Sequence, residues 1–216
     1  GDIFGDLKES PDENMRRYSF LQRYYYDLYT HTDDNDRLRS GIDPDNAAAF
    51  YLFINLVQGD DNKSLGKNFY LLLQNGKEGG RALYAPWDLD LTWGNQYIGV
   101  LSENCTSPYA QAEDYNCIIE SGYISQLLIN GDASVWNMIF EKYRALRKNG
   151  WSEENINAMI DEYEADIYGS GAYRRDMARW SGGNYMDPAE GLGTFRAYAM
   201  RRLAEMDLYY DRLAAF

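Results

Sequence analysis

Histidine and cysteine are scarce in this sequence, and their scarcity excludes several kinds of catalytic and metal site. The 216 residues include one histidine, His31, and two cysteines, Cys105 and Cys117. A single histidine nearly excludes a His-based catalytic triad, and it excludes a multi-histidine metal centre. A tetrahedral zinc site also has too few ligands. The candidates that remain are carboxylate and amide oxygens, which favour Mg²⁺, Mn²⁺ or Ca²⁺.

Long apolar runs and an excess of positive charge are also missing. The longest apolar run, 50–57, is far shorter than the about 20 residues that span a bilayer, so no membrane span is expected. The first ten residues lack the basic and apolar stretches of a signal peptide, which suggests a mature or trimmed segment. Asp and Glu total 34 against 21 Lys and Arg, a net charge of −13. Such a surface repels phosphate backbones, so no nucleic-acid partner is expected.

The two cysteines enclose the polar segment CTSPYAQAEDYNC, which is typical of a loop. Two cysteines that close one loop suit a disulfide in an exported protein. Two unpaired thiols are the alternative, because spacing alone does not fix a bridge.

Apolar and aromatic residues are plentiful enough for a folded core. They make up 45% and 15% of the sequence, which excludes intrinsic disorder. Two short apolar runs around Asn75-Gly76 and Gly79-Gly80 predict a β-hairpin. The polar segment 31–41 is interpreted as a solvated loop. Apolar spacing and capping residues predict helices at 12–30, 44–57, 120–129, 132–148, 152–168, 171–180 and 187–213, with strands at 68–73 and 81–85. We therefore predict a mainly α (α+β) fold, one domain over residues 1–216, with a single small hairpin.

Acidic and amide side chains gather around this hairpin, at Asp60, Asp61, Asn68, Asp88 and Asp90. If their segment is extended, Asp88 and Asp90 share one face, and their apolar neighbours predict partial burial. Two such carboxylates repel each other unless a proton or cation neutralises them, and a bound Mg²⁺ is one solution. The alternative is that they cap the hairpin or pair with arginine.

The order of these residues is also that of phosphoryl-transfer sites. There, a loop aspartate orients or accepts the substrate hydroxyl proton, and an asparagine and a later aspartate hold the metal ions on the nucleotide. Asp60 fits the first role and Asn68 the second. The alternative for Asp60 is a turn residue, because Gly-Asp-Asp-Asn is good turn chemistry.

The segments GDDNKSLGKNFYLLL (59–73) and YAPWDLDLTWG (84–94) resemble the spore coat protein H (CotH) kinase family. The most specific piece is the W-D-L-D-L-T-W-G run. The resemblance implies an atypical protein kinase that is secreted or at the cell surface, for example in a spore coat. It also implies that the kinase uses ATP with Mg²⁺ or Mn²⁺ and phosphorylates Ser/Thr hydroxyls of proteins. It further implies the helical C-terminal lobe of a kinase-like fold, with the hairpin carrying the metal-site carboxylates. The N-terminal nucleotide-binding lobe is expected to be absent, and the chain alone is expected to be inactive.

Carried over by position, the resemblance makes Asp60 the catalytic aspartate, and Asn68 and Asp88 metal ligands, with Asp90 a second carboxylate. The sequence departs from the pattern in two ways. Asp61 beside Asp60 leaves the catalytic assignment open by one residue. Asp60 and Asn68 are eight positions apart (68 − 60), whereas ordinary kinases have about five. A non-catalytic CotH-like module that binds protein or glycan at the cell surface is the alternative function.

Overall fold

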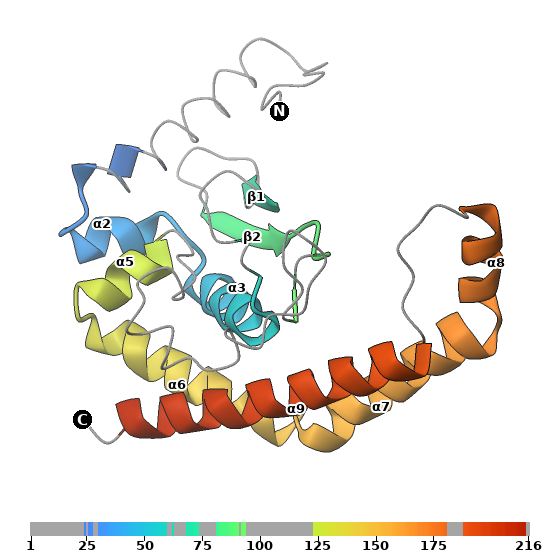
Figure 1. The fold of residues 1–216 in the computed structure, drawn as a ribbon. Helices are drawn as coiled ribbons and strands as arrows, with labels where there is room; N and C mark the ends of the chain where they lie inside the picture. Colours follow the sequence, from blue (N-terminus) through green and yellow to red (C-terminus); the bar gives the residue numbers. More distant parts are fainter. Residues whose placement is uncertain are drawn as a thin grey trace, which may run out of the picture.

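The computed structural model describes residues 24, 26, 27, 30–59, 62, 68–73, 81–90, 92, 93, 123–180 and 188–214. Within these residues, a mainly helical fold with one antiparallel hairpin is confirmed (Figure 1). The helices are α2 (Asn35–Ser40), α3 (Pro44–Val57), α5 (Tyr123–Ile129), α6 (Ala133–Lys148), α7 (Glu153–Glu164), α8 (Ala172–Arg179) and α9 (Pro188–Leu213), with a π-helical turn (Ala165–Gly169) after α7. The strands are β1 (Phe69–Leu73) and β2 (Ala82–Pro86). Most of the helix predicted at 12–30, and the segment between Cys105 and Cys117, lie outside the described residues.

Helix α3 forms the centre of the core. The Asp43 carboxylate accepts a hydrogen bond from the Asn46 backbone N–H at 2.9 Å, and Pro44 begins the helix, as predicted. Apolar side chains on most sides of α3 are buried, and the helix contacts β2, α5, α6 and α9. Figure 1 shows the hairpin on one side of α3 and α9 on the other.

The hairpin is fixed on α3 by an asparagine side chain. The Asn46 amide donates to the Tyr84 carbonyl at 3.1 Å, and the Asn46 carbonyl oxygen accepts from the Tyr84 N–H at 2.6 Å. The side chain thus pairs with β2 as a neighbouring strand would. In the register of the hairpin, Phe69 lies opposite Pro86 and Leu73 lies opposite Ala82.

The segment 31–41 is not a solvated loop, and that prediction is wrong. It contains helix α2, in which the Leu38 side chain is fully buried. The Asp34 carboxylate caps the helix by accepting from the Arg37 N–H at 3.0 Å. Arg39 forms an ion pair with Asp132, the N-cap residue of α6. Burial of one leucine and these polar contacts hold α2 on the core.

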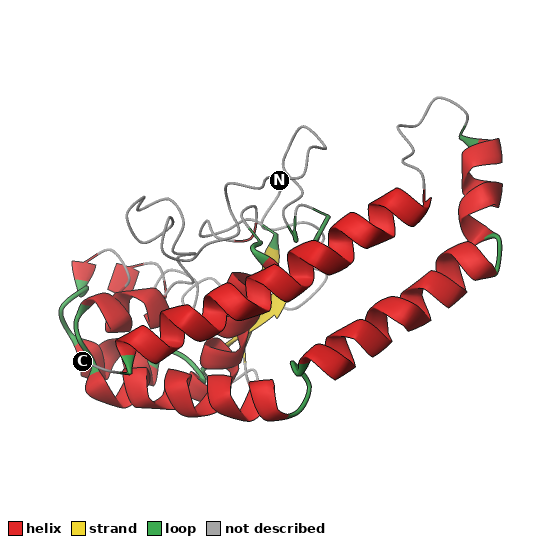
Figure 2. Cartoon of the chain, turned by 60° about the horizontal axis from the view of Figure 1, so that its bottom comes forward, coloured by secondary structure: helices red, strands yellow, loops and turns green. Residues whose placement is uncertain are grey.

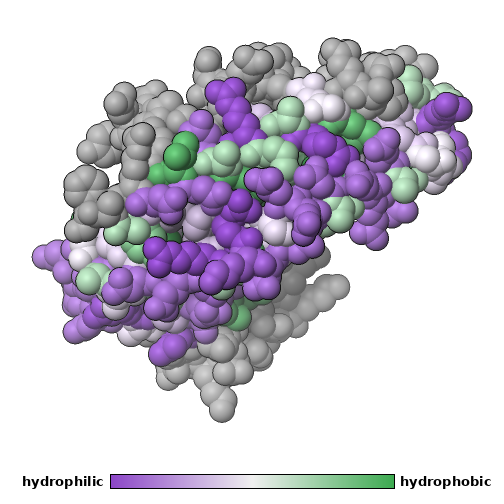
Figure 3. All heavy atoms as spheres, turned by 90° about the horizontal axis from the view of Figure 1, so that it is seen from below, coloured by the Kyte–Doolittle hydropathy of each residue, from purple (hydrophilic) through white to green (hydrophobic). Residues whose placement is uncertain are grey.

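Helices α7 and α9 lie side by side and extend away from the core toward α8 (Figure 2). Arg196 on α9 contacts Asn157 and Asp161 on α7, each at 2.7 Å. The face seen from below is mostly hydrophilic (Figure 3), as expected for a chain with a net charge of −13. No described helix combines the length and the apolar character needed to cross a membrane.

Candidate functional site

The hairpin brings two of the predicted metal ligands to one end. Asn68 immediately precedes β1, and its carbonyl accepts a hydrogen bond from the Trp87 N–H at 3.1 Å. Asp88 therefore follows directly after the residue that pairs with Asn68. Asn68 and Asp88 thus lie at the same end of the hairpin, as the sequence predicts.

Left-handed backbone conformations gather around this end. In the part of the chain that the structure describes, the non-glycine residues with positive φ are Gln58, Asn68, Asp88 and Trp93, with φ between 53° and 57°. Asparagine and aspartate tolerate this conformation better than most residues, whereas glutamine and tryptophan are strained in it. Such strain tends to gather at functional sites, which makes this region the candidate site of the chain.

The expectation for Asp88 and Asp90 was wrong in two respects. Strand β2 ends at Pro86, and the left-handed turn at Asp88 breaks the extended segment on which the shared-face argument relied. Both carboxylates are exposed, not partly buried. The apolar neighbours do not cover them, because the Trp87 side chain is itself 58% exposed, while Leu89 packs against the core.

The loop before the hairpin begins at the C-terminal end of α3, where the carbonyls of the last four helical residues each have a donor. The last four carbonyls of a helix lack partners within the helix. The Ile54 carbonyl accepts from the N–H groups of Gln58 and Gly59, and the Val57 carbonyl accepts from the Trp93 N–H at 2.5 Å. The guanidinium of Arg202, on α9, donates to the remaining two, Asn55 at 3.1 Å and Leu56 at 3.4 Å.

One face of α9 supports the strained residues. Phe195, Tyr198 and Arg202 are spaced three and four residues apart, so they lie on the same face of the helix. The Phe195 ring packs edge-on against Trp93 with centroids 5.6 Å apart. The Tyr198 hydroxyl bonds the Gln58 side-chain carbonyl, and the Arg202 side chain is only 1% exposed. The sequence analysis predicted this segment only as a helix, at 187–213.

A buried asparagine that sequence reasoning missed lies inside the loop. The Asn62 side chain is 1% exposed, and its amide nitrogen donates to the carbonyls of Asn68 at 2.6 Å and Trp87 at 2.8 Å. The Asn62 Oδ1 and the Gln58 Nε2 are buried without a hydrogen-bond partner among the described residues. The only signal in the sequence was the turn chemistry of Gly-Asp-Asp-Asn. The predicted catalytic residue Asp60 and its neighbour Asp61 lie outside the described residues.

With this geometry established, comparison with known proteins identifies the family. A family model described as CotH kinase protein matches residues 5–206. The chain belongs to the CotH kinase family. Searches of curated proteins and of solved structures each found no match. The matched region covers both the hairpin segments and most of α9, so the CotH resemblance noted in the sequence is confirmed over nearly the whole chain.

The oxygen donors at the hairpin end of this CotH chain fit a hard divalent cation with an incomplete protein shell. Carboxylate and amide oxygens are suitable ligands for Mg²⁺ or Mn²⁺, and the exposure of Asp88 leaves room for water and phosphate. Within the described ranges, no group of three or more His, Cys, Asp or Glu side chains could hold a metal ion. A cation here therefore needs ligands beyond Asp88 and Asp90, as Mg²⁺ does when substrate phosphates complete its shell.

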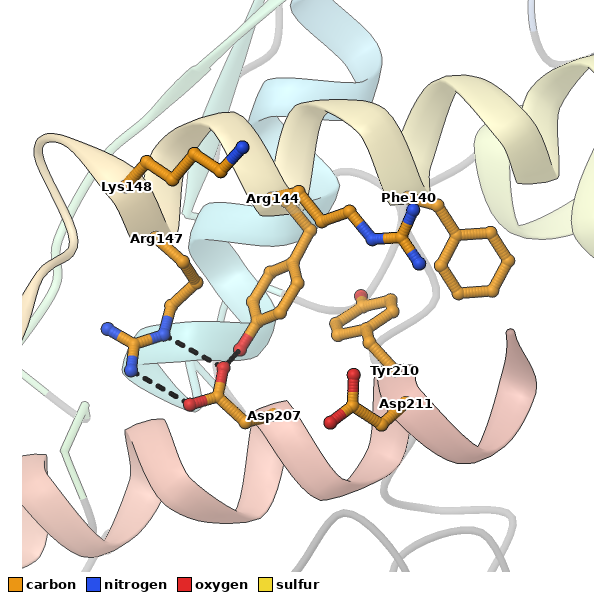
Figure 4. Close-up of a pocket in the computed structure, with 8 residues that line it drawn as sticks. Phe140, Arg144, Arg147, Lys148, Asp207, Tyr210 and Asp211 are labelled. Carbon is orange, nitrogen blue, oxygen red and sulfur yellow. Dashed lines mark hydrogen bonds and ion pairs between the residues drawn. The ribbon is translucent and has the colours of Figure 1, made fainter. Parts of the chain in front are cut away.

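A pocket of about 300 Å³ lies between α6 and α9, away from the hairpin (Figure 4). Arg147 donates to both carboxylate oxygens of Asp207 at 2.8 Å, and the Tyr143 hydroxyl donates to the same carboxylate at 2.5 Å. Burial raises the pKa of Asp207, but the hydrogen bonds from Arg147 and Tyr143 outweigh it and hold the pKa below its usual range. These contacts join two helices, so we interpret this pocket as structural.

Proposed function

We propose that this CotH chain carries the catalytic site of an atypical protein kinase, which transfers the γ-phosphate of ATP to serine or threonine hydroxyls of proteins. The observation that carries the proposal is the hairpin end, where the left-handed residues Asn68 and Asp88 are brought together beyond the C-terminus of α3. Membership of the family indicates a kinase-like domain. The order of aspartate, asparagine and aspartate along the chain matches phosphoryl-transfer sites.

Each residue has a distinct role in this proposal. Asp60 accepts the proton of the substrate hydroxyl, and Asn68 and Asp88 supply oxygen ligands for Mg²⁺ or Mn²⁺. Asp90 is a second candidate carboxylate. A cation held by these residues would supply the positive charge that neutralises the phosphates during transfer. That neutralisation is needed on a chain with a net charge of −13, because an uncompensated nucleotide would be repelled.

The proposed partner is a protein with Ser/Thr hydroxyls, and the proposed location is secreted or at the cell surface, including a spore coat. No nucleic-acid partner is proposed, on account of the acidic charge. The expectation that residues 1–216 alone transfer phosphate at no appreciable rate stays a prediction.

A non-catalytic binding module is the second candidate, and one observation favours it. Tyr70 and Trp87 are 50% and 58% exposed, and their ring centroids lie 5.3 Å apart beside Asp88. Exposed aromatic rings of this kind can stack on a sugar or pack against a protein. A module with this function alone has no need for a cation at the neighbouring carboxylate.

Titration with Mn²⁺ separates the two candidates. We expect millimolar Mn²⁺ to raise the melting temperature, because a ligand that binds the native state stabilises it. The substitution Asp88→Asn removes the charge but keeps a side chain that tolerates the left-handed backbone. It should weaken Mn²⁺ binding, measured by isothermal titration, by about tenfold or more.

The matched control is Asp33→Asn, which removes the charge of another exposed aspartate outside the hairpin. It lowers the net negative charge equally and should leave Mn²⁺ affinity unchanged. Equal affinity in wild type and Asp88→Asn would show that the metal role of Asp88 is wrong. Absence of any Mn²⁺ binding by the wild type would favour the binding module.

A further inference from the structure

Asn62 joins three segments of the proposed site. Its backbone N–H donates to the Gly59 carbonyl at 2.9 Å, just after the end of α3. Its side-chain nitrogen donates to the carbonyl of Asn68, at the start of β1, and to the carbonyl of Trp87, just before Asp88. One residue therefore contacts the loop, the first metal-ligand segment and the second metal-ligand segment.

The chemistry of an amide suits this position. A primary amide has two N–H donors, and here each has a backbone carbonyl as its acceptor. The two carbonyls belong to residues that pair across the hairpin, because the Trp87 N–H donates to the Asn68 carbonyl. Asn62 thus fixes the distance between the two strand ends at the point where the backbone turns left-handed on both sides.

The Asn62 side chain is held in place although its buried carbonyl oxygen is poorly satisfied. Asn62 is almost fully buried, yet its Oδ1 has no hydrogen-bond partner among the described residues. A β-carbon added to Gly59 would lie 2.8 Å from that oxygen, so the loop backbone packs directly against it. A buried acceptor without a partner is unfavourable and needs an explanation, which the two bonds made by the nitrogen provide.

We propose that Asn62 is a positioning residue, which sets the placement of Asn68 and Asp88 relative to each other at the end of the hairpin. This inference rests on the proposed function for its consequence in catalysis. It acts through backbone carbonyls, so Asn62 itself contacts neither metal nor substrate. Loss of its amide should move the two metal-ligand segments apart and weaken metal binding while the rest of the fold persists.

The test compares Asn62→Ala with Asn46→Ala. Asn46 is a matched control, because its amide also bonds the hairpin backbone, but at Tyr84 in the middle of β2. Both variants remove an amide that holds the hairpin, so both should lower the melting temperature. Only Asn62→Ala should raise the dissociation constant for Mn²⁺, by about tenfold, as outer-shell substitutions do at metal sites. If Asn62→Ala does not fold, Asn62→Ser is used in its place, because the smaller side chain leaves space for a water that bridges the two carbonyls.

A second readout measures the segments without metal. The amide hydrogen of Trp87 reports the closing bond of the hairpin, and its exchange with solvent is measured by NMR at a temperature where all variants are folded. We expect Asn62→Ala to lose protection at Trp87 by about tenfold relative to wild type. Asn46→Ala should keep that protection.

The outcomes separate this inference from the proposed function. If wild type binds Mn²⁺ and Asn62→Ala binds it equally well, Asn62 does not position the metal ligands and the inference is overturned. If wild type does not bind Mn²⁺, the metal part of the proposed function fails and the exchange data decide. Protection at Trp87 that is lost only in Asn62→Ala then supports the positioning role, and protection kept in both variants overturns it.

Discussion

Replacing Arg202 by methionine should destabilise the protein strongly, although Arg202 lies far along the sequence from the candidate site. Its side chain is 1% exposed, and it donates to the carbonyls of Asn55 and Leu56 in the last turn of α3. That turn contains no basic residue of its own. Arg202 therefore supplies the positive charge that favours a helix C-terminus, as well as the donors.

The magnitude follows from these contacts. Methionine keeps much of the volume of the arginine stem but offers no donor, so two carbonyls at this site lose their partner. Each buried carbonyl left without a donor costs about 1–3 kcal/mol. Loss of the cation near the helix end adds about 0.3–1 kcal/mol. Together these give an expected loss of about 2–7 kcal/mol, a large part of the about 5–15 kcal/mol that a typical domain has.

Urea unfolding followed by circular dichroism measures this loss. The matched control is Arg201→Met, the same substitution at the neighbouring exposed residue of α9. It should change the free energy of unfolding by about 0.5 kcal/mol or less. A loss below about 1 kcal/mol for Arg202→Met would refute the reasoning, because it would mean that the carbonyls of α3 find other donors at little cost.

Two further predictions concern the loop and the pocket. Gly59→Ala should destabilise the protein by about 1–3 kcal/mol and weaken Mn²⁺ binding, because the new β-carbon would displace the Asn62 side chain. The control is Gly150→Ala, where nothing lies within 4 Å of the added β-carbon, and equal melting temperatures for the two variants would contradict the prediction. The pKa of Asp207 is lowered in the folded state, so its contribution is present above the ordinary value of 3.8 and is lost as the pH falls through the folded pKa. At neutral pH, wild type and Asp207→Asn should differ in unfolding free energy by about 1 kcal/mol, because the carboxylate is partly exposed. This difference should shrink in acid, and a difference that does not vary with pH would count against the ion pair with Arg147.

Most of the secondary structure could be predicted because local signals coincide with the ends of the elements. Asp132 and Ser152 cap α6 and α7 through their side chains, as their positions in the sequence indicate. The strands predicted at 68–73 and 81–85 agree with β1 and β2 within one residue. In each case the cap or turn residue acts on backbone groups nearby, so the signal is contained in a short window.

Helix α2 was missed because its stability does not come from its own sequence. Six residues are too few for a stable isolated helix. What holds it is the burial of Leu38 and the ion pairs of Arg37 with Asp27 and of Arg39 with Asp132. These partners are distant in the sequence or on another helix, so the polar composition of the segment indicated a loop instead.

The candidate site was predicted in part, for a related reason. The motif placed Asn68 and Asp88 at adjoining strand ends, which the hairpin register bears out. The exposure of Asp88 was not predicted, because the alternation rule assumes an extended backbone and φ is 57° at this residue. Asn62 and Arg202 were also missed. Both donate to backbone carbonyls, and every residue has a carbonyl, so side-chain identities do not reveal the partner.

The strained backbone of the site is held by two different supports. The two residues for which a left-handed conformation is least favourable, Gln58 and Trp93, are the two that α9 contacts, through Tyr198 and Phe195. Asn68 and Asp88 tolerate that conformation, and the amide of Asn62 instead links Asn68 to Trp87, the residue before Asp88. Helix α9 thus contacts the part of the candidate site that carries strain, and Asn62 contacts the part that carries the proposed oxygen ligands. The long C-terminal helix therefore matters for the site as much as the hairpin does, although it supplies none of the proposed ligands.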